Sequence, residues 1–265
     1  MKYLTCLLLV VAVLSAQTVE ERVQDMAQSL AGNAASLVSS GVVSNAGCRG
    51  GLPHFNIGAA VNMGWFKFQN PATSEDVEFP AFFPYLYSEL GLFRGFSVTP
   101  AFRELFAVDF ICKYAPTLVK ADYFQDLPYL FAYGIKIQLL KDQLIPPTPA
   151  ISVTIMNSMY QGLTFEFEDT LYTKLALDDL SVRAAVSKSL PIVTPYGGIS
   201  YDTYSMKTDY WTSGDATHKA ISDIEKEALS YFVGFEFKVL VLKGYLEGQY
   251  RNEKFGLTLG VKAGI

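Results

Sequence analysis

Long hydrophobic runs are scarce in this chain of 265 residues. The apolar segment from Leu4 to Leu14 falls short of the roughly 18 residues that a membrane-crossing helix needs. It follows Lys2 and precedes Ser15 and Ala16, an order that is typical of a secretory signal peptide. We therefore predict a signal over residues 1–16, export of the chain, and no transmembrane helix after the signal.

Cysteine and histidine are also rare, with three and two residues. The sequence has no paired-histidine metal spacing, no glycine loop for phosphate and no cluster of cysteines, so we expect neither a metal nor a cofactor. Cys6 leaves with the signal, which leaves Cys48 and Cys112 for a disulfide in an oxidising compartment. That disulfide is the less favoured alternative, because Cys112 falls on the apolar face of its strand.

An excess of basic charge is lacking as well. The formal net charge is -5 and the pI is about 5.1, so a nucleic-acid partner is not expected. Half of the residues are hydrophobic, and the mean hydropathy of +0.21 is high for a soluble protein but modest for a helical membrane protein. A barrel lies between these classes, because only one face of each strand meets lipid.

The hydrophobic residues alternate along the chain. Apolar side chains occupy every second position from Leu229 to Val239 and from Phe255 to Ile265, with small or charged residues between them. A period of two indicates β-strands. Because the small and charged face cannot be a core, the apolar face looks outward, as a bilayer requires of strands of about 9 to 11 residues in a closed barrel.

The same pattern predicts a closed antiparallel transmembrane β-barrel over residues 51–265, with about ten strands and a range of 8 to 12. An even number places both ends of the barrel on the periplasmic side. The strands are expected at Pro53–Phe68, Tyr85–Phe96, Leu105–Ala115, Tyr129–Lys141, Ala150–Tyr160, Leu180–Lys188, Thr194–Met206, Leu229–Val239, Gly244–Arg251 and Phe255–Ile265.

The connections on the outer side are predicted to be mostly the longer ones. Gln69 to Pro80 is expected to be a turn-forming segment, and Lys207 to Lys226 the longest loop, with a helical turn between Ala220 and Ala228. An acidic outer segment contains Glu166, Glu168, Asp169, Asp178 and Asp179. These carboxylates either attract cations or simply lie in a solvated loop. An aromatic girdle at the outer strand ends is expected from Trp65, Phe68, Phe82 to Tyr87, Tyr114, Tyr129, Phe131, Tyr201, Tyr204, Tyr231, Tyr250 and Phe255.

Residues 17–50 precede the barrel. Apolar side chains at helical spacing from Thr18 to Leu37, with acidic residues near the start, predict a short amphipathic helix followed by a flexible connector from Gly41 to Gly51. Two interpretations stay open. The helix plugs the barrel, or it docks at the rim in a loosely ordered form.

The last strand, which alternates up to the chain terminus, resembles the final strand of bacterial outer-membrane β-barrels, although Ile265 stands where most of them have an aromatic residue. A family of uncharacterised outer-membrane barrels is similar through Gly51-Leu52-Pro53-His54-Phe55 and through Ser187-Lys188-Ser189-Leu190 ahead of Thr194-Pro195-Tyr196-Gly197-Gly198. The resemblance implies an outer-membrane location, with outer-membrane lipid and the barrel assembly machinery as partners. It implies no single function.

Charged residues on the inward faces are the candidates for lining the lumen: Glu89, Asp109, Lys113, Lys136, Arg183, Asp202, Glu236, Lys238, Glu247, Arg251 and Lys262. A barrel of about ten strands is only slightly wider than one that its own side chains fill, so a wide diffusion pore is not expected. A salt-bridged interior accounts for this set of both signs, because charges removed from water must be paired.

Three functions remain open. The first is passive or selective transport of a small or hydrophobic solute, and the second is a structural or ligand- or partner-binding barrel without an open pore. A lipid-modifying enzyme is the least supported, because His54 and His218 have no serine or aspartate partner by spacing, and we expect no enzyme. A soluble β-rich periplasmic protein is the alternative architecture.

Overall fold

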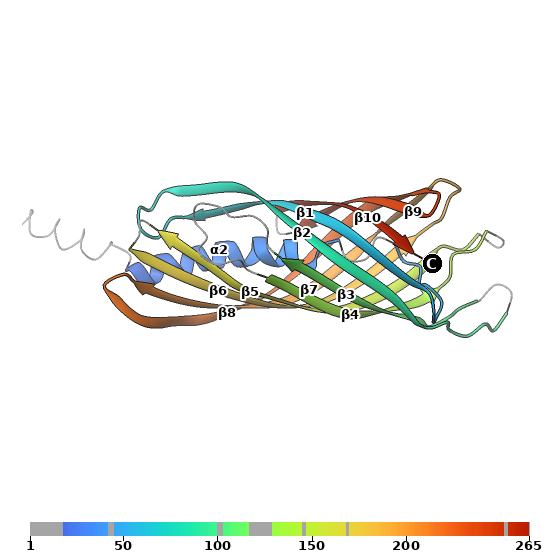
Figure 1. Cartoon of the computed structure of the whole chain (residues 1–265), viewed down its shortest axis with the longest axis horizontal. Coiled ribbons are helices and arrows are strands. Elements are labelled where there is room, and N and C mark those ends of the chain that lie inside the picture. Colours follow the sequence, from blue (N-terminus) through green and yellow to red (C-terminus); the bar gives the residue numbers. More distant parts are fainter. Residues whose placement is uncertain are drawn as a thin grey trace, which may run out of the picture.

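The fold is a closed antiparallel barrel of ten strands, as the alternation predicts. The computed structural model describes residues 18–41, 45–99, 103–116, 129–144, 147–167, 170–251 and 254–264, so the predicted signal lies outside the described residues. Each strand pairs with its neighbours in the chain, and β1 closes the barrel against β10 (Figure 1). The strands are β1 (Phe55–Gln69), β2 (Asp76–Phe93), β3 (Ala107–Pro116), β4 (Tyr129–Leu140), β5 (Ala150–Phe167), β6 (Leu171–Ser187), β7 (Val193–Thr212), β8 (Asp215–Val239), β9 (Leu242–Arg251) and β10 (Lys254–Gly264).

Around one end of the barrel, apolar side chains face outward and polar ones inward. On β8, Leu229, Val233 and Phe237 are exposed, whereas Ser230 and Glu236 are buried inside. Aromatic side chains end this apolar zone, since Tyr231 pairs with Tyr250 and Tyr250 pairs with Phe255 across neighbouring strands. Exposed members of this girdle are Trp65, Phe82, Tyr114, Tyr201, Tyr231, Tyr250 and Phe255. We call the part between the C-terminal end of the barrel and this girdle the membrane half.

Beyond the girdle the pattern is inverted. We call residues 66–79, 160–167, 170–178 and 203–228 the projecting half. Its outward residues are polar, such as Lys174, Lys207 and Glu225, whereas Leu175 and Ile224 point inward and are buried. β8 has 25 residues, or about 80 Å of chain, although about 9 to 11 residues suffice to cross a bilayer. The projecting half is therefore built for water on its outer side.

Among the described residues, only some of the strands continue into the projecting half. β3 is described to Pro116 and β9 to Arg251, whereas the hairpin β1–β2 and the sheet β5–β8 extend further, with a helix between them (Figure 1). Aromatic rings join the hairpin to the sheet, because Phe68 packs edge-on against Phe165 at 5.8 Å and Phe83 packs against Tyr160 at the same ring distance. These contacts hold the two walls together beyond the described ends of β3 and β4.

The predicted N-terminal helix is present as α2 (Val19–Ser39). Thr18 caps it, since its hydroxyl accepts from the backbone N–H of Glu21 at 3.2 Å while the Glu21 carboxylate accepts from the Thr18 N–H at 2.8 Å. The helix lies inside the barrel rather than at its rim (Figure 1), and Ala35 and Leu37, on opposite faces of the helix, are both at most 4% exposed.

Several sequence predictions about the connections are wrong. The expected loop from Lys207 to Lys226, including its helical turn, is strand in β7 and β8, with only Ser213 and Gly214 between them. Asp76 to Pro80 belongs to β2. The longer connections do not lie mostly on the predicted outer side, since residues 94–106, which join β2 to β3, lie at the other end of the barrel. The inverted pattern explains the first error, because its polar outward positions look like a solvated loop.

The girdle prediction needs a similar correction. Phe68, Phe83, Tyr85, Tyr87 and Tyr204 point inward and are buried, so they belong to the interior instead. The acidic outer segment is also wrong in part, because Glu166 lies on β5 and Asp178 and Asp179 lie on β6. Glu168 and Asp169 lie outside the described residues.

Candidate functional site: the filled lumen

The direction of α2 is fixed by its contacts with β1 and with the turn after it. As the helix advances, its partners move back along β1 toward the start of that strand. The pairs are Arg22 Nη1 to the Ala72 carbonyl at 3.4 Å, Ser29 Oγ to the Lys67 carbonyl at 2.6 Å, and Asn62 Nδ2 to the Leu37 carbonyl at 2.5 Å. The helix therefore begins at the projecting end and runs antiparallel to β1 toward the membrane half.

Apolar packing holds α2 in the projecting half. Val23, Met26 and Leu30 are inaccessible to solvent and belong to one cluster with the inward residues of the walls, among them Phe165 and Leu175. The exposed side chains of α2, such as Gln28, are confined to its first turns, and the last turns are buried on every side. The helix thus takes the place of a hydrophobic core between the two walls.

The C-terminal end of α2 meets four side chains of the barrel wall, which we call the clamp: Asn62, Tyr85, Lys113 and Tyr245. Lys113 Nζ donates to the carbonyls of Val38 at 3.0 Å and Ser40 at 3.1 Å, and it lies 4.0 Å from the centre of the Tyr85 ring. The last carbonyls of a helix lack partners within the helix and favour a cation, so Lys113 meets both needs.

Gly41, two residues after the last residue of α2, is held by two tyrosines of the clamp. Its carbonyl accepts from the hydroxyls of Tyr85 at 2.7 Å and Tyr245 at 3.1 Å, and its N–H donates to Glu247 at 3.3 Å. Its φ of 73° lies in the left-handed region, and a Cβ atom there would overlap the Tyr85 hydroxyl and the Thr258 methyl group. Only glycine fits this point of the chain without strain.

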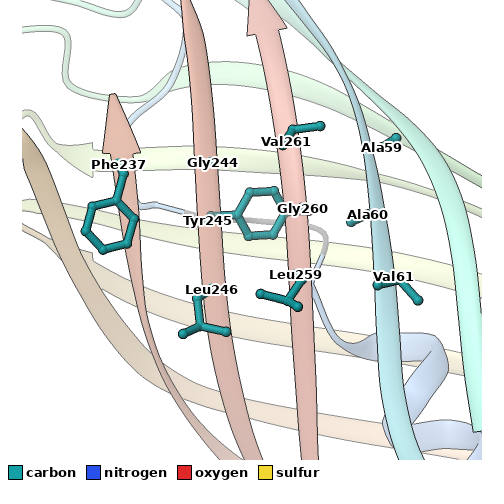
Figure 2. Close-up of a pocket in the computed structure, with 10 residues that line it drawn as sticks. All are labelled: Ala59, Ala60, Val61, Phe237, Gly244, Tyr245, Leu246, Leu259, Gly260 and Val261. Carbon is teal, nitrogen blue, oxygen red and sulfur yellow. The ribbon is translucent and has the colours of Figure 1, made fainter. Parts of the chain in front are cut away.

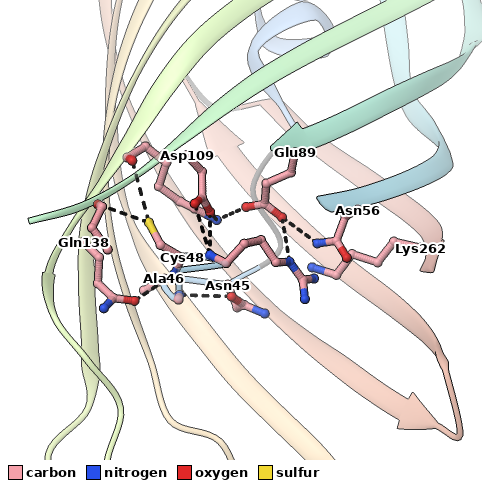
Figure 3. A network of polar contacts seen from close by, with 12 residues as sticks. Asn45, Ala46, Cys48, Asn56, Glu89, Asp109, Gln138 and Lys262 are labelled. Atoms are coloured by element: carbon pink, nitrogen blue, oxygen red, sulfur yellow. Dashed lines mark hydrogen bonds and ion pairs between the residues drawn. The ribbon is translucent and has the colours of Figure 1, made fainter. Parts of the chain in front are cut away.

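The connector then crosses the membrane half, bonded to a succession of strands (Figure 3). Each described residue from Asn45 to Arg49, apart from Gly47, bonds to a different strand. The bonds are Asn45 Nδ2 to Glu236 at 2.8 Å, the Ala46 N–H to Ser187 Oγ at 3.1 Å, the Cys48 N–H to Gln138 Oε1 at 2.8 Å, and the Arg49 N–H to Asp109 at 2.8 and 3.1 Å. Residues 18–41 and 45–49 thus contact the wall in both the projecting half and the membrane half.

Ion pairs complete the interior of the membrane half. Lys136 pairs with Glu89 and lies 3.8 Å from Asp109, while the Arg49 guanidinium lies 3.7 Å from Glu89. Three further acidic residues form ion pairs inside the barrel. Glu236 pairs with Lys262 at 2.6 Å and with Lys243 at 3.0 Å, Glu247 pairs with Arg183 at 2.5 Å, and Asp202 pairs with Arg251 at 3.4 Å. Charges of both signs are thus neutralised around the connector, as burial requires.

The structure places ten of the eleven candidate lumen residues inside the barrel, all of them buried. Lys238 has the inward parity but lies exposed near the end of β8, where the barrel opens. The interior also contains charged residues outside the candidate set. The sequence analysis missed Arg49 because it lies in the connector, and it missed Lys243 because it lies at the start of β9.

Asp179 is the third charged residue of the interior that the sequence analysis missed. It lies on the inward face of β6 with 1% of its surface exposed, and neither carboxylate oxygen has a hydrogen-bond partner. The alternation of Val182 and Leu180, continued one step further back, would have placed Asp179 inside the barrel.

The cysteines and histidines occupy unrelated places. Cys48 lies in the lumen with its thiol 3.5 Å from the Ala107 carbonyl, whereas Cys112 has the outward parity of β3. Both are free, so the disulfide alternative is wrong. His54 contacts the Gly51 carbonyl at 2.8 Å, and His218 stacks on Trp211 at 4.3 Å on β8, not in a loop.

Two hollows differ in their surroundings. A groove of about 650 Å³ lies on the outer wall where β8, β9, β10 and β1 are neighbours, lined by apolar residues such as Phe237, Leu259 and Val61 (Figure 2). A cavity of about 170 Å³ lies below the connector at the C-terminal end of the barrel, beside Arg49 and Lys243. The groove faces lipid and the cavity ends at the connector, so neither crosses the barrel.

Solved structures provide the comparison that decides the fold. The translocator domain of the autotransporter NalP from Neisseria meningitidis superposes with a TM-score of 0.54 over 91% of this chain and 98% of that chain, at 10% identity. The outer membrane protease OmpT from Escherichia coli gives 0.52 over 80% and 97%, at 11% identity. The fold is that of bacterial outer-membrane β-barrels. At such identities the likeness concerns the fold alone.

The outer-membrane barrel has no match among protein-family models or curated proteins. In the part of the chain that the structure describes, no helix is long and apolar enough to cross a membrane. The narrower resemblance to a family of uncharacterised barrels stays a prediction.

Proposed function

We propose that this chain is a closed outer-membrane barrel, a binding or structural element whose projecting half offers a surface beyond the bilayer, rather than a diffusion pore. The observation that carries the proposal is that the described residues of α2 and of the connector fill both halves of the lumen. Apolar packing fills the projecting half, and hydrogen bonds from Asn45 to Arg49 reach five strands of the membrane half when the Arg49–Glu89 ion pair is included.

The free energy of opening favours this reading over a pore. Withdrawal of α2 would expose five large apolar side chains, Val23, Met26, Leu30, Leu37 and Val38, which are all at most 4% exposed. At about 1.5 to 3 kcal/mol for each, the cost is on the order of 10 kcal/mol. Such a cost leaves about one molecule in ten million open at equilibrium.

Gated transport of a small polar solute is the second candidate. It is favoured by the membrane half, where the connector is held by hydrogen bonds and ion pairs instead of apolar contacts. Displacement of the connector alone would leave a polar lumen, but α2 would still block the projecting half. A transporter would therefore need an external source of free energy or a ligand that moves the helix.

Conductance in planar bilayers separates the two candidates. We would compare the chain from Gln17 to Ile265 with a variant lacking residues 17–50 and with the variant Asn45→Ala/Asp109→Asn. The double substitution weakens the bonds of the connector, together with the Asp109–Lys136 ion pair of the wall, and leaves the contacts of α2 unchanged. Heat-modifiable migration would confirm that each protein is folded. The closed barrel predicts silence from the full chain and from the loosened variant, with discrete conductance only after the deletion.

Frequent openings of the full chain would contradict the proposal. Openings of the loosened variant alone would move the assignment to gated transport. A folded deletion variant without conductance would show that the wall itself closes the lumen, and the role assigned to α2 would fail.

A further inference from the structure

The two ends of the barrel differ in a way that orients it in the membrane. At the C-terminal end the apolar outer face continues to the turns after β6 and β8, where Ile192, Leu240 and Val241 are at least 71% exposed, so the strands here end flush with the bilayer even though residues 94–106 and 141–149 form longer connections. At the other end the walls project with polar outer faces. In an outer-membrane barrel with an even number of strands both ends of the barrel chain lie on the periplasmic side, and here β1 begins and β10 ends at the C-terminal end, where Asn56 pairs with Gly264. The projecting half therefore lies on the cell surface.

The path of the chain follows from this orientation. α2 begins at the projecting end beside Ala72, and the connector reaches the flush end, where Arg49 meets Glu89 and β1 begins. A chain exported into the periplasm has its N-terminal end in that compartment before the barrel forms. That end has to pass through the lumen during assembly, since the barrel is closed around the segment.

We propose that this barrel carries its own N-terminal segment across the outer membrane and holds the start of α2 on the cell surface. The inference rests on the proposed closed barrel, and it adds a display function to it. The segment fits the lumen as a helix about 10 to 12 Å wide, so it crosses as a single unfolded or helical chain and not as a folded domain.

Cysteine labelling on whole cells tests the proposal. In a background with Cys48→Ser and Cys112→Ser, single cysteines would be placed at Val19, Gly214 and Val241. Val19 is 40% exposed at the start of α2, and Val241 is 75% exposed in the turn between β8 and β9. Gly214, in the turn between β7 and β8, has open space around its position. The reagent is a maleimide on a long polyethylene glycol chain, which the intact outer membrane excludes.

The proposal predicts rapid labelling of Val19→Cys and Gly214→Cys on intact cells, and labelling of Val241→Cys only after permeabilisation. Protection of Val19→Cys while Gly214→Cys reacts would overturn the threading. Labelling of Val241→Cys alone on intact cells would overturn the orientation. Heat-modifiable migration of each variant confirms assembly, and an epitope inserted ahead of Thr18, read with an antibody, repeats the test without cysteine chemistry.

The result is independent of the conductance experiment. A full chain that conducts while Val19→Cys stays labelled would remove the closed barrel and keep the display. A silent chain with Val19→Cys protected would keep the closed barrel and remove the display.

Discussion

The two halves of the barrel solve opposite problems with the same strands. In the membrane half the outside is apolar and the inside is polar, so ion pairs such as Glu236 with Lys262 keep the interior together. In the projecting half the outside is polar and the inside is apolar, so α2 acts as a hydrophobic core. One strand, β8, belongs to both halves and changes its pattern near Leu229. The solvent outside each part decides which face is apolar.

The comparison predicts that a charge placed on α2 damages the projecting half severely. Leu30→Asp puts a carboxylate where Leu30 is inaccessible to solvent among apolar side chains. A buried charge without a partner is among the most destabilising changes, so we expect a loss of more than about 4 kcal/mol in the free energy of unfolding. Urea unfolding of the protein in detergent measures it.

The matched control is Gln28→Asp, two residues away on the exposed side of the same helix. It should change the free energy of unfolding by less than about 0.5 kcal/mol. Equal effects of the two variants would contradict the placement of α2 inside the barrel.

In the membrane half the sensitive change is the removal of a charge. Glu236→Gln leaves Lys243 and Lys262 without the carboxylate that both now contact at 3.0 and 2.6 Å. Breaking a buried pair in this way costs about 3 to 5 kcal/mol, and the additional change Lys262→Met should restore part of it. The midpoint of urea unfolding is the measurement.

Glu227→Gln on the exposed outer face of β8 is the control, and it should be nearly silent. If Glu236→Gln were equally silent, the interior of the membrane half would be hydrated. The ion pairs would then not stabilise that half, which would contradict the comparison.

Gly41 lies where the two halves meet. Gly41→Ala forces a side chain into a left-handed position against Tyr85 and Thr258, and we expect a loss of about 1 to 3 kcal/mol. Gly214→Ala, which meets open space, should have almost no effect. Thermal unfolding followed by heat-modifiable migration compares the two. Tolerance of alanine at position 41 would mean that the clamp does not hold the chain as described.

The smallest expected effect is at the flush end, outside the membrane. Partial burial raises the pKa of the Asp142 carboxyl, but hydrogen bonds from Lys188 and Ser189 outweigh it and hold the pKa below its usual value. Because the folded pKa is lowered, the contribution is present above the unfolded pKa near 4 and is lost as the pH falls through the folded value. It should be at most about 1 kcal/mol.

Unfolding measured between about pH 6 and pH 3 on the native chain and on Asp142→Asn checks this point. The native chain should lose slightly more stability than the variant over that range. Parallel curves would show that the ion pair contributes nothing.

The sequence predicts the membrane half well because a single rule operates there. Alternation with apolar residues outward finds the lower part of β8, from Leu229 to Val239, and most of the buried charges. The rule fails beyond the girdle, where Lys219, Asp223 and Glu225 point to water and were interpreted as a loop. Asp179 was misplaced for a different reason, because the alternation of β6 was stopped at Leu180, one residue too early.

The helix illustrates a different limit. Its apolar spacing and its acidic first turn predict α2 closely, but an apolar stripe packs equally well against a rim or inside a lumen. The choice between them depends on the inward aromatic residues of distant strands, such as Phe68 and Phe165. No local pattern of the sequence contains that information.

The central claim is that the N-terminal segment fills the lumen of the assembled barrel, and a disulfide bond tests it most directly. The Ala46 N–H lies 3.1 Å from Ser187 Oγ on the inner wall, so Ala46→Cys with Ser187→Cys, in a background lacking Cys48 and Cys112, brings two thiols together. After mild oxidation in the outer membrane, we predict nearly complete cross-linking, seen as a mobility shift of the heated, unreduced protein. A folded barrel whose two cysteines stay reduced would contradict the claim.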